Sequence, residues 1–128
     1  MRLLLDTHVF IWWDSDPGRL SKNSLSFLQD ASNTLLLSLV SVWEIQIKSS
    51  LGKLFLSQPL RDLIEYHRQN NGIQVLPIEL AHIYALDALP PHHRDPFDRL
   101  LIAQTAAESI SVVTMDPIFT QYPVKVVR

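Results

Sequence analysis

The sequence of 128 residues predicts an α/β fold, a three-layer sandwich in which helices cover both faces of a central five-stranded parallel sheet. Residues 3–5 and 34–39 are apolar almost throughout and lack the alternation of a half-exposed strand, which is typical of strands buried on both faces. Such segments alternate with helical patterns, as parallel strands require because crossover segments must join them. We expect a single domain spanning residues 1–128.

In the first half of the chain, residues 8–13 are expected to form a short helix that ends at the turn-forming run 14–18. Ser21 is a suitable N-cap for a helix to about residue 31. The spacing of Ser41 and Glu44 matches a capping box, so we expect the next helix to begin at Ser41 and to stop before Gly52.

The second half continues the alternation of helices and strands. Helices are expected from residue 59 to about 70, over 78–86 and over 96–109, with strands at 73–76, 111–114 and 124–127. Asp95 is a good N-cap for the helix at 96–109, and Pro96 suits its first position, where no N–H is needed. Capping alone would therefore explain Asp95.

The composition excludes several classes of protein. Apolar residues make up 47% of the chain and charged residues 19%, so disorder is excluded. The absence of cysteine excludes disulfides and thiolate metal sites and suits a reducing cytosol, so we expect a cytoplasmic protein. Asp6 and His8 interrupt the apolar N-terminus, and no apolar run is long enough to cross a membrane.

The net charge of −2 argues against a general nucleic-acid coat protein. It still allows a nucleic-acid substrate, because neutralising four acids at one metal site would leave the rest of the chain mildly positive.

Acidic residues fall where a ligand site would form in such a sheet. Asp6 follows the first strand and Asp116 follows the fourth, so both belong at the carboxyl edge, where open parallel sheets bind ligands. Glu44, at the start of the helix after the second strand, belongs at the same edge. Asp98 lies in a helix that precedes its strand, so we expect only a reversed or reoriented helix start to bring it there.

Several carboxylates in one crevice would repel one another unless a cation were bound. Oxygen ligands without cysteine favour Mg²⁺ or Mn²⁺ over zinc. The chemistry that this indicates is metal-assisted hydrolysis of a phosphodiester.

Four segments together resemble the PIN-domain nucleases, and among them the VapC-type toxins of type II toxin–antitoxin systems. The segments are 3–8 (LLLDTH), 41–48 (SVWEIQIK), 94–104 (RDPFDRLLIAQ) and 113–116 (VTMD). The resemblance implies the sheet order 3-2-1-4-5 and an endoribonuclease that uses Mg²⁺ or Mn²⁺ to cut RNA. It also implies a VapB-like antitoxin as partner and a homodimer.

Carried over position by position, the resemblance implies that the catalytic and metal-binding acids are Asp6, Glu44, Asp98 and Asp116. Asp98 rather than Asp95 matches the third acid of the family, and Asp95 is left as either a helix cap or a further ligand. Thr7 and Thr114 match hydroxyl groups that orient the acids or a water molecule.

Other residues have two interpretations each. Lys48 and Arg99 could contact a substrate phosphate or pair locally on a solvated face. His92 and His93 are expected to line a loop at the rim of the crevice rather than to bind zinc. The tryptophans, Trp12, Trp13 and Trp43, could stack on bases, although core or interface packing is the expected role.

The main alternative function is a non-catalytic RNA- or protein-binding module on the same fold. A phosphoacceptor receiver domain would need two adjacent acids after the first strand, which Leu5-Asp6-Thr7 does not provide. A DNA-cutting flap-type nuclease is disfavoured because the chain has no room for clamp insertions.

Overall fold

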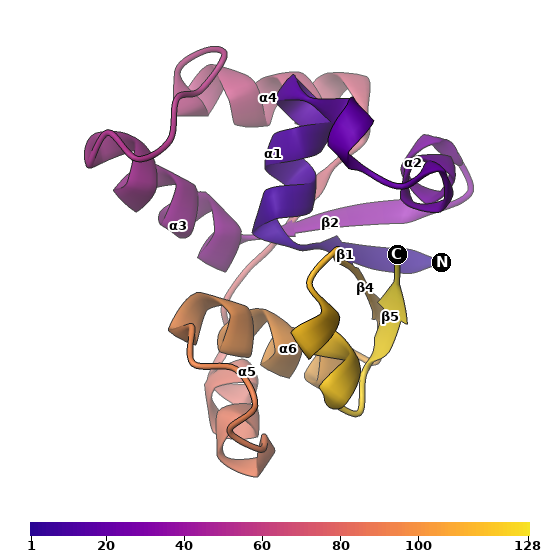
Figure 1. The fold of residues 1–128 in the computed structure, drawn as a ribbon, viewed down its shortest axis with the longest axis vertical. Coiled ribbons are helices and arrows are strands. Elements are labelled where there is room, and N and C mark those ends of the chain that lie inside the picture. Colours follow the sequence, from indigo (N-terminus) through magenta and orange to yellow (C-terminus); the bar gives the residue numbers. More distant parts are fainter.

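The computed structural model describes all residues, 1–128, and contains one five-stranded sheet whose strands are all parallel (Figure 1). The strands run in the order β3-β2-β1-β4-β5, which confirms the predicted fold class and strand order. Their bounds are β1 (Arg2–Leu5), β2 (Thr34–Ser38), β3 (Gln74–Leu76), β4 (Ser111–Val113) and β5 (Lys125–Val127).

Six α-helices connect and cover these strands. They are α1 (Thr7–Ser15), α2 (Lys22–Gln29), α3 (Leu39–Ser50), α4 (Leu60–Asn70), α5 (Leu80–Ala85) and α6 (Pro96–Glu108). Short 3₁₀ turns add Pro17–Arg19, Leu86–Ala88 and Pro117–Gln121, so the expected helix at 78–86 is in fact α5 followed by a 3₁₀ turn. None of the helices has both the length and the apolar character needed to cross a membrane.

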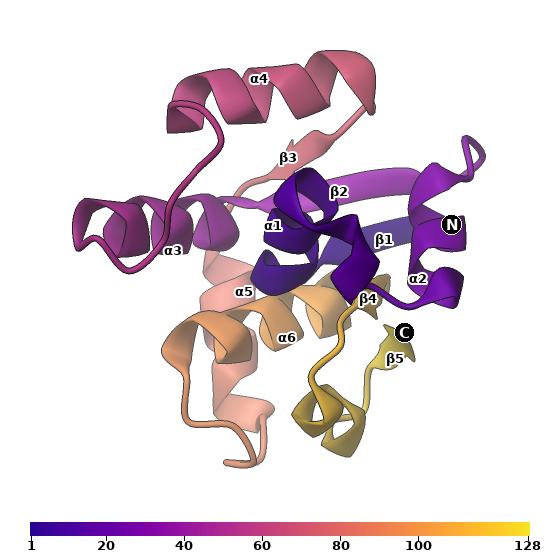
Figure 2. The same ribbon diagram turned by 45° about the horizontal axis from the view of Figure 1, so that its top comes forward.

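Three of the four residues of the central strand β1 are completely buried, since Leu3, Leu4 and Leu5 have no exposed surface. Leu3 and Leu5 face the core under α1 and α4, whereas Leu4 faces the opposite core with Leu101 of α6. Figures 1 and 2 show α1 and α4 on one side of the sheet and α6 on the other, with α5 outside α6. These two cores explain why the strand residues are apolar without alternation.

Helix α3 begins three residues earlier than the capping-box pattern predicts. Its N-cap is Ser38, the last residue of β2, whose hydroxyl accepts a hydrogen bond of 3.0 Å from the Val40 N–H. Ser41 and Glu44 therefore lie inside the helix, and the predicted capping box was wrong. Because another serine caps the helix first, the Glu44 carboxylate is free to reach away from the helix end.

The direction of α6 explains how Asp98 reaches the carboxyl edge of the sheet. The helix ends at Glu108, and β4 starts at Ser111, opposite Leu3 near the amino edge of the sheet. A helix that leads into a parallel strand runs antiparallel to it, so its first turn lies at the carboxyl edge. Asp98 reaches that edge without any reversed helix start, and the expectation that topology could not place it was wrong.

We predict that Ser38→Ala destabilises the fold by about 1–3 kcal/mol, measured by urea denaturation. Ser38 is completely buried, and its hydroxyl both caps α3 and donates a 2.6 Å hydrogen bond to Gln104 Oε1 of α6. Ser50→Ala, at the exposed end of the same helix, is the matched control and should change stability by less than about 0.5 kcal/mol. Equal effects of the two substitutions would contradict this role of Ser38.

Candidate metal and active site

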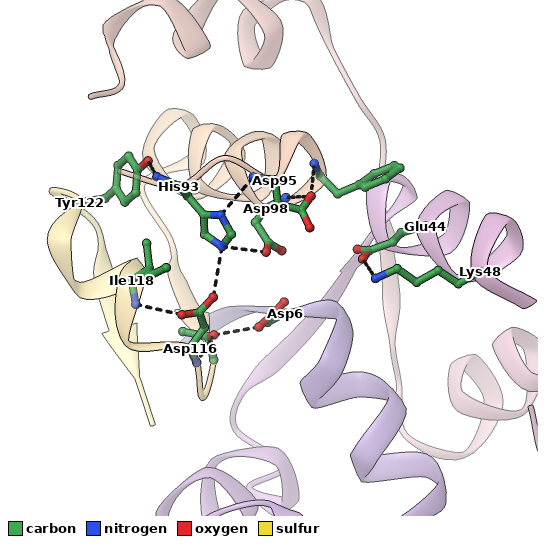
Figure 3. Close-up of polar contacts among 11 residues, drawn as sticks. Asp6, Glu44, Lys48, His93, Asp95, Asp98, Asp116, Ile118 and Tyr122 are labelled. Carbon is green, nitrogen blue, oxygen red and sulfur yellow. Dashed lines mark hydrogen bonds and ion pairs between the residues drawn. The ribbon is translucent and has the colours of Figure 1, made fainter. Parts of the chain in front are cut away.

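Four acidic side chains meet at the carboxyl edge of the sheet. Asp6 follows β1, Glu44 is in the second turn of α3, Asp98 is in the first turn of α6 and Asp116 follows β4. Figure 3 shows Asp6, Asp98 and Asp116 pointing toward one another, with Glu44 reaching toward the same space from the other side. The structure thus brings together all four acids that the sequence analysis selected.

Asp6 is positioned by the pairing of β1 with β4. Leu5 lies opposite Val113 in the register, so Asp6 and Thr114 leave adjacent strands side by side. The Thr114 hydroxyl donates a 2.8 Å hydrogen bond to Asp6 Oδ2, as expected of an orienting hydroxyl. Asp6 is only 4% exposed, and burial raises the pKa of its carboxyl despite the hydrogen bond from Thr114.

Glu44 is almost completely buried, and Lys48 of the next turn donates to its Oε2. Burial alone would lower the pKa of Lys48. The hydrogen bond and charge of Glu44, with the charges of Asp95 and Asp98, raise it instead. Lys48 therefore stays a cation at the edge of the acid cluster.

Asp98, like Asp6, has a pKa raised above the ordinary value of an aspartate. Burial and the negative charges of Asp6, Asp95, Glu44 and Asp116 raise its pKa to about 8. Because like charges repel, these four acidic neighbours disfavour a negative charge on the Asp98 carboxyl. Without a cation, Asp98 would therefore retain its proton at neutral pH.

Asp95 and Asp116 use their carboxylates as caps. Asp95 Oδ1 accepts from the backbone N–H groups of Phe97 and Asp98, at 2.8 and 3.4 Å, so the structure shows Asp95 as the N-cap of α6. Asp116 Oδ1 accepts from the Ile118 N–H at 2.9 Å. Each carboxylate thus has an oxygen committed to the backbone.

His93 is a site residue that the sequence analysis placed only at the rim. Its Nε2 lies 2.9 Å from Asp98 Oδ2 and 3.1 Å from Asp116 Oδ2, between the two acids (Figure 3). A signal was present, because a residue two positions before the N-cap of α6 must lie at the same edge as Asp98. Its neighbour His92 packs outside, against the ring of Tyr122.

Two other predicted site residues lie elsewhere. The Arg99 guanidinium donates to the carbonyl oxygens of Pro90 and Leu86, at 3.0 and 3.5 Å, so it fastens the chain before α6 and is not presented to a phosphate. The Thr7 hydroxyl donates to Ser41 Oγ at 2.8 Å and joins α1 to α3 instead of contacting an acid.

The tryptophans are divided between packing and exposure. Trp12 and Trp13 are half-buried against the core, and Trp13 contacts the His67 ring, as packing predicts. Trp43 of α3 is 58% exposed, and its ring packs in a T-shaped arrangement with the ring of Phe97 of α6.

Two oxygens in this cluster have no hydrogen-bond partner. Asp6 Oδ1 and Glu44 Oε1 are the only buried side-chain polar atoms in the structure that lack one. A buried, unpartnered carboxylate oxygen is costly, and a bound cation removes that cost. The residues present therefore fit a divalent cation, and their oxygen donors favour Mg²⁺ or Mn²⁺.

Two groups have donor atoms within 4.8 Å of one another: His93, Asp98 and Asp116 in this cluster, and Glu79, His82 and Glu108 elsewhere. The geometry of the second group is that of a helix cap, because His82 Nδ1 accepts from the Glu79 N–H while His82 Nε2 lies 2.9 Å from Glu108 Oε1. It contains no unpartnered buried oxygen, which distinguishes it from the acid cluster around Asp6.

The chain matches the PIN domain family over residues 3–125. Ribonuclease VapC22 of Mycobacterium tuberculosis is 30% identical over 118 residues, which cover 89% of this chain and 86% of that protein.

Solved structures share the fold at lower identity. The VapBC2 complex of Rickettsia felis, bound to a DNA fragment from its promoter, contains a chain with a TM-score of 0.74 and 16% identity. That match covers 98% of this chain and 97% of the other. FitAcB of Neisseria gonorrhoeae matches with a TM-score of 0.65 and 20% identity, over 98% of this chain and 96% of that one. The family match over residues 3–125 and the similarity to ribonuclease VapC22 show that the chain belongs to the PIN-domain family and is of the VapC type.

Proposed function

We propose that this protein is an endoribonuclease that depends on Mg²⁺ or Mn²⁺ and hydrolyses phosphodiester bonds in RNA. The observation that carries the proposal is the pair of unpartnered, buried oxygens, Asp6 Oδ1 and Glu44 Oε1, beside an Asp98 that is surrounded by acids. The similarity to a protein named ribonuclease VapC22 supports RNA as the substrate class.

In this proposal, Asp6, Glu44 and Asp98 hold the cation. When bound, the cation supplies positive charge for the phosphate oxygens and lowers the pKa of a water molecule. Thr114 keeps Asp6 in place by its hydrogen bond to Oδ2, which leaves Oδ1 for the cation. Asp116 completes the wall of the site, although the Ile118 N–H and His93 already engage its two oxygens.

Lys48 has a dual role in the proposal. It holds Glu44 Oε2, and with about a third of its side chain exposed it can also meet a phosphate that enters the crevice. Arg99 has no such role, because backbone carbonyls engage its guanidinium.

A non-catalytic binding module is the rival function. A scaffold that only bound RNA or protein would gain nothing from gathering four acids, two of them buried, because their repulsion lowers stability. The two unpartnered oxygens therefore favour catalysis over passive binding.

A protein partner belongs to the same proposal. Similar solved structures are complexes of the VapBC toxin–antitoxin family, so we propose a VapB-like antitoxin as inhibitor and a homodimer as the unbound state. Light scattering of the purified chain at two concentrations tests the dimer, and a mass of one chain at both would contradict it.

We predict that the purified protein cleaves RNA when Mg²⁺ or Mn²⁺ is added and that EDTA abolishes cleavage. Asp98→Asn should lower the rate by at least about 100-fold, the scale on which one preorganised charged group acts. Asp30→Asn is the matched control and should leave the rate unchanged, because Asp30 is an exposed acid just before β2, at the opposite edge of the sheet. Cleavage that survives EDTA would refute metal-dependent catalysis.

We also predict that the metal-free protein becomes less stable as the pH rises toward 8. The pKa of Asp98 is about 8 in the folded chain and 3.8 ordinarily, so between these values the folded state binds a proton that the unfolded state does not. Acidification therefore favours folding in this window, and the advantage is lost as the pH rises. Thermal melts in EDTA between pH 6 and pH 8.5 should show a smaller fall for Asp98→Asn than for the wild type.

The same melts with Mn²⁺ provide the control for this prediction. Mn²⁺ should raise the midpoint more at pH 8.5 than at pH 6, because deprotonated ligands bind metal better. Identical pH dependence of the wild type and Asp98→Asn would show that the Asp98 proton does not matter for stability.

A further inference from the structure

The hydrogen bonds of His93 determine which of its ring nitrogens carries the proton. Nδ1 accepts a hydrogen bond of 3.2 Å from the backbone N–H of Asp95, so Nδ1 must present a lone pair. Nε2 therefore carries the hydrogen, and it faces Asp98 Oδ2 at 2.9 Å and Asp116 Oδ2 at 3.1 Å (Figure 3). His93 thus donates a hydrogen bond to Asp116, and the same nitrogen contacts a carboxylate oxygen of Asp98.

The ring is held in this orientation from behind. The backbone N–H of His93 donates a 2.8 Å hydrogen bond to the hydroxyl of Tyr122, a side chain that is itself 4% exposed. The rings of His93 and buried Phe119 also pack in a T-shaped arrangement, with centroids 6.1 Å apart and ring planes at 88°. These contacts fix both the loop before α6 and the direction of the Nε2–H bond.

His93 could act either as a hydrogen-bond donor to the acids or as a metal ligand. The donor atoms of His93, Asp98 and Asp116 lie close enough together to hold a metal. A metal on Nε2 would require the proton to move to Nδ1, where it would oppose the N–H of Asp95. The Asp95 N–H therefore favours His93 as a donor to the acids and disfavours it as a metal ligand.

We propose that His93 is a positioning residue whose Nε2–H holds Asp98 and Asp116 so that the cation site is preformed. The contact of Nε2 with Asp98 Oδ2 leaves Oδ1 as the Asp98 oxygen for the cation. Asp116 accepts from the Ile118 N–H at Oδ1 and from His93 at Oδ2, so it acts on the site through His93. This inference rests on the proposed cation site but not on RNA cleavage.

The experiment measures Mn²⁺ binding by isothermal titration calorimetry for the wild type, His93→Ala, His93→Gln and His92→Ala. Loss of the donor in His93→Ala should weaken Mn²⁺ binding by roughly 10- to 100-fold, the usual effect of removing a group that orients a ligand. His93→Gln supplies an amide N–H of similar reach and should restore most of the affinity. His92→Ala, the neighbouring histidine outside the cluster, should bind like the wild type.

The Mn²⁺ affinities of the His93 variants decide whether His93 positions the acids. An unchanged affinity in His93→Ala, or a His93→Gln variant as weak as His93→Ala, would overturn the proposal. If His93→Ala fails to fold, as judged by circular dichroism, the comparison of His93→Gln with the wild type and the spectroscopic test below still decide.

A second readout tests directly whether the imidazole binds the metal. Electron spin-echo envelope modulation of the Mn²⁺-loaded wild type should show no strong ¹⁴N coupling from a directly bound imidazole. Such a coupling that disappears in His93→Gln would make His93 a ligand and overturn the proposal. A wild type that binds no Mn²⁺ would instead refute the cation site itself, so failure of the proposed function is distinguishable from failure of this inference.

Discussion

Repulsion among buried carboxylates is the constraint on which the rest of the site depends. Asp6 and Glu44 are nearly inaccessible to solvent, Asp98 lies among them, and each of Asp6 and Glu44 has one oxygen without a partner. Such an arrangement lowers the stability of the protein when no cation is bound. It persists because the sheet and two helices hold the acids from separate directions, and it is relieved when positive charge enters.

The fold builds this arrangement from helix starts. Asp6, Asp95 and Asp116 are the N-cap residues of α1, α6 and the 3₁₀ turn Pro117–Gln121, so the positive ends of helix dipoles converge where the acids gather. Asp95 and Asp116 each accept a capping hydrogen bond with one carboxylate oxygen, whereas the Asp6 side chain makes no capping hydrogen bond. That difference separates the acids that stabilise helix ends from the acid that remains available to a ligand.

The sequence predicts much of this fold for clear physical reasons. Unbroken apolar strands indicated a parallel sheet, and the positions of Asp6 and Asp116 after strands placed them at one edge. The strand order and the role of Asp98 came from the resemblance to PIN domains, although the direction of α6 would have placed Asp98 without it. Ser38 shows the limit of local patterns, because Ser41 and Glu44 have capping-box spacing but an earlier serine caps the helix. The role of His93 was not predicted, because it depends on the Asp95 N–H and on Asp116, which only the folded chain brings together.

The central claim is that the acid cluster around Asp6 is a cation site. Anomalous diffraction from crystals soaked in Mn²⁺ tests it most directly. We expect one strong peak bordered by Asp6 Oδ1 and by oxygens of Glu44 and Asp98, with no nitrogen of His93 bound to it. A peak only at Glu79, His82 and Glu108, or no peak in either cluster, would contradict the account.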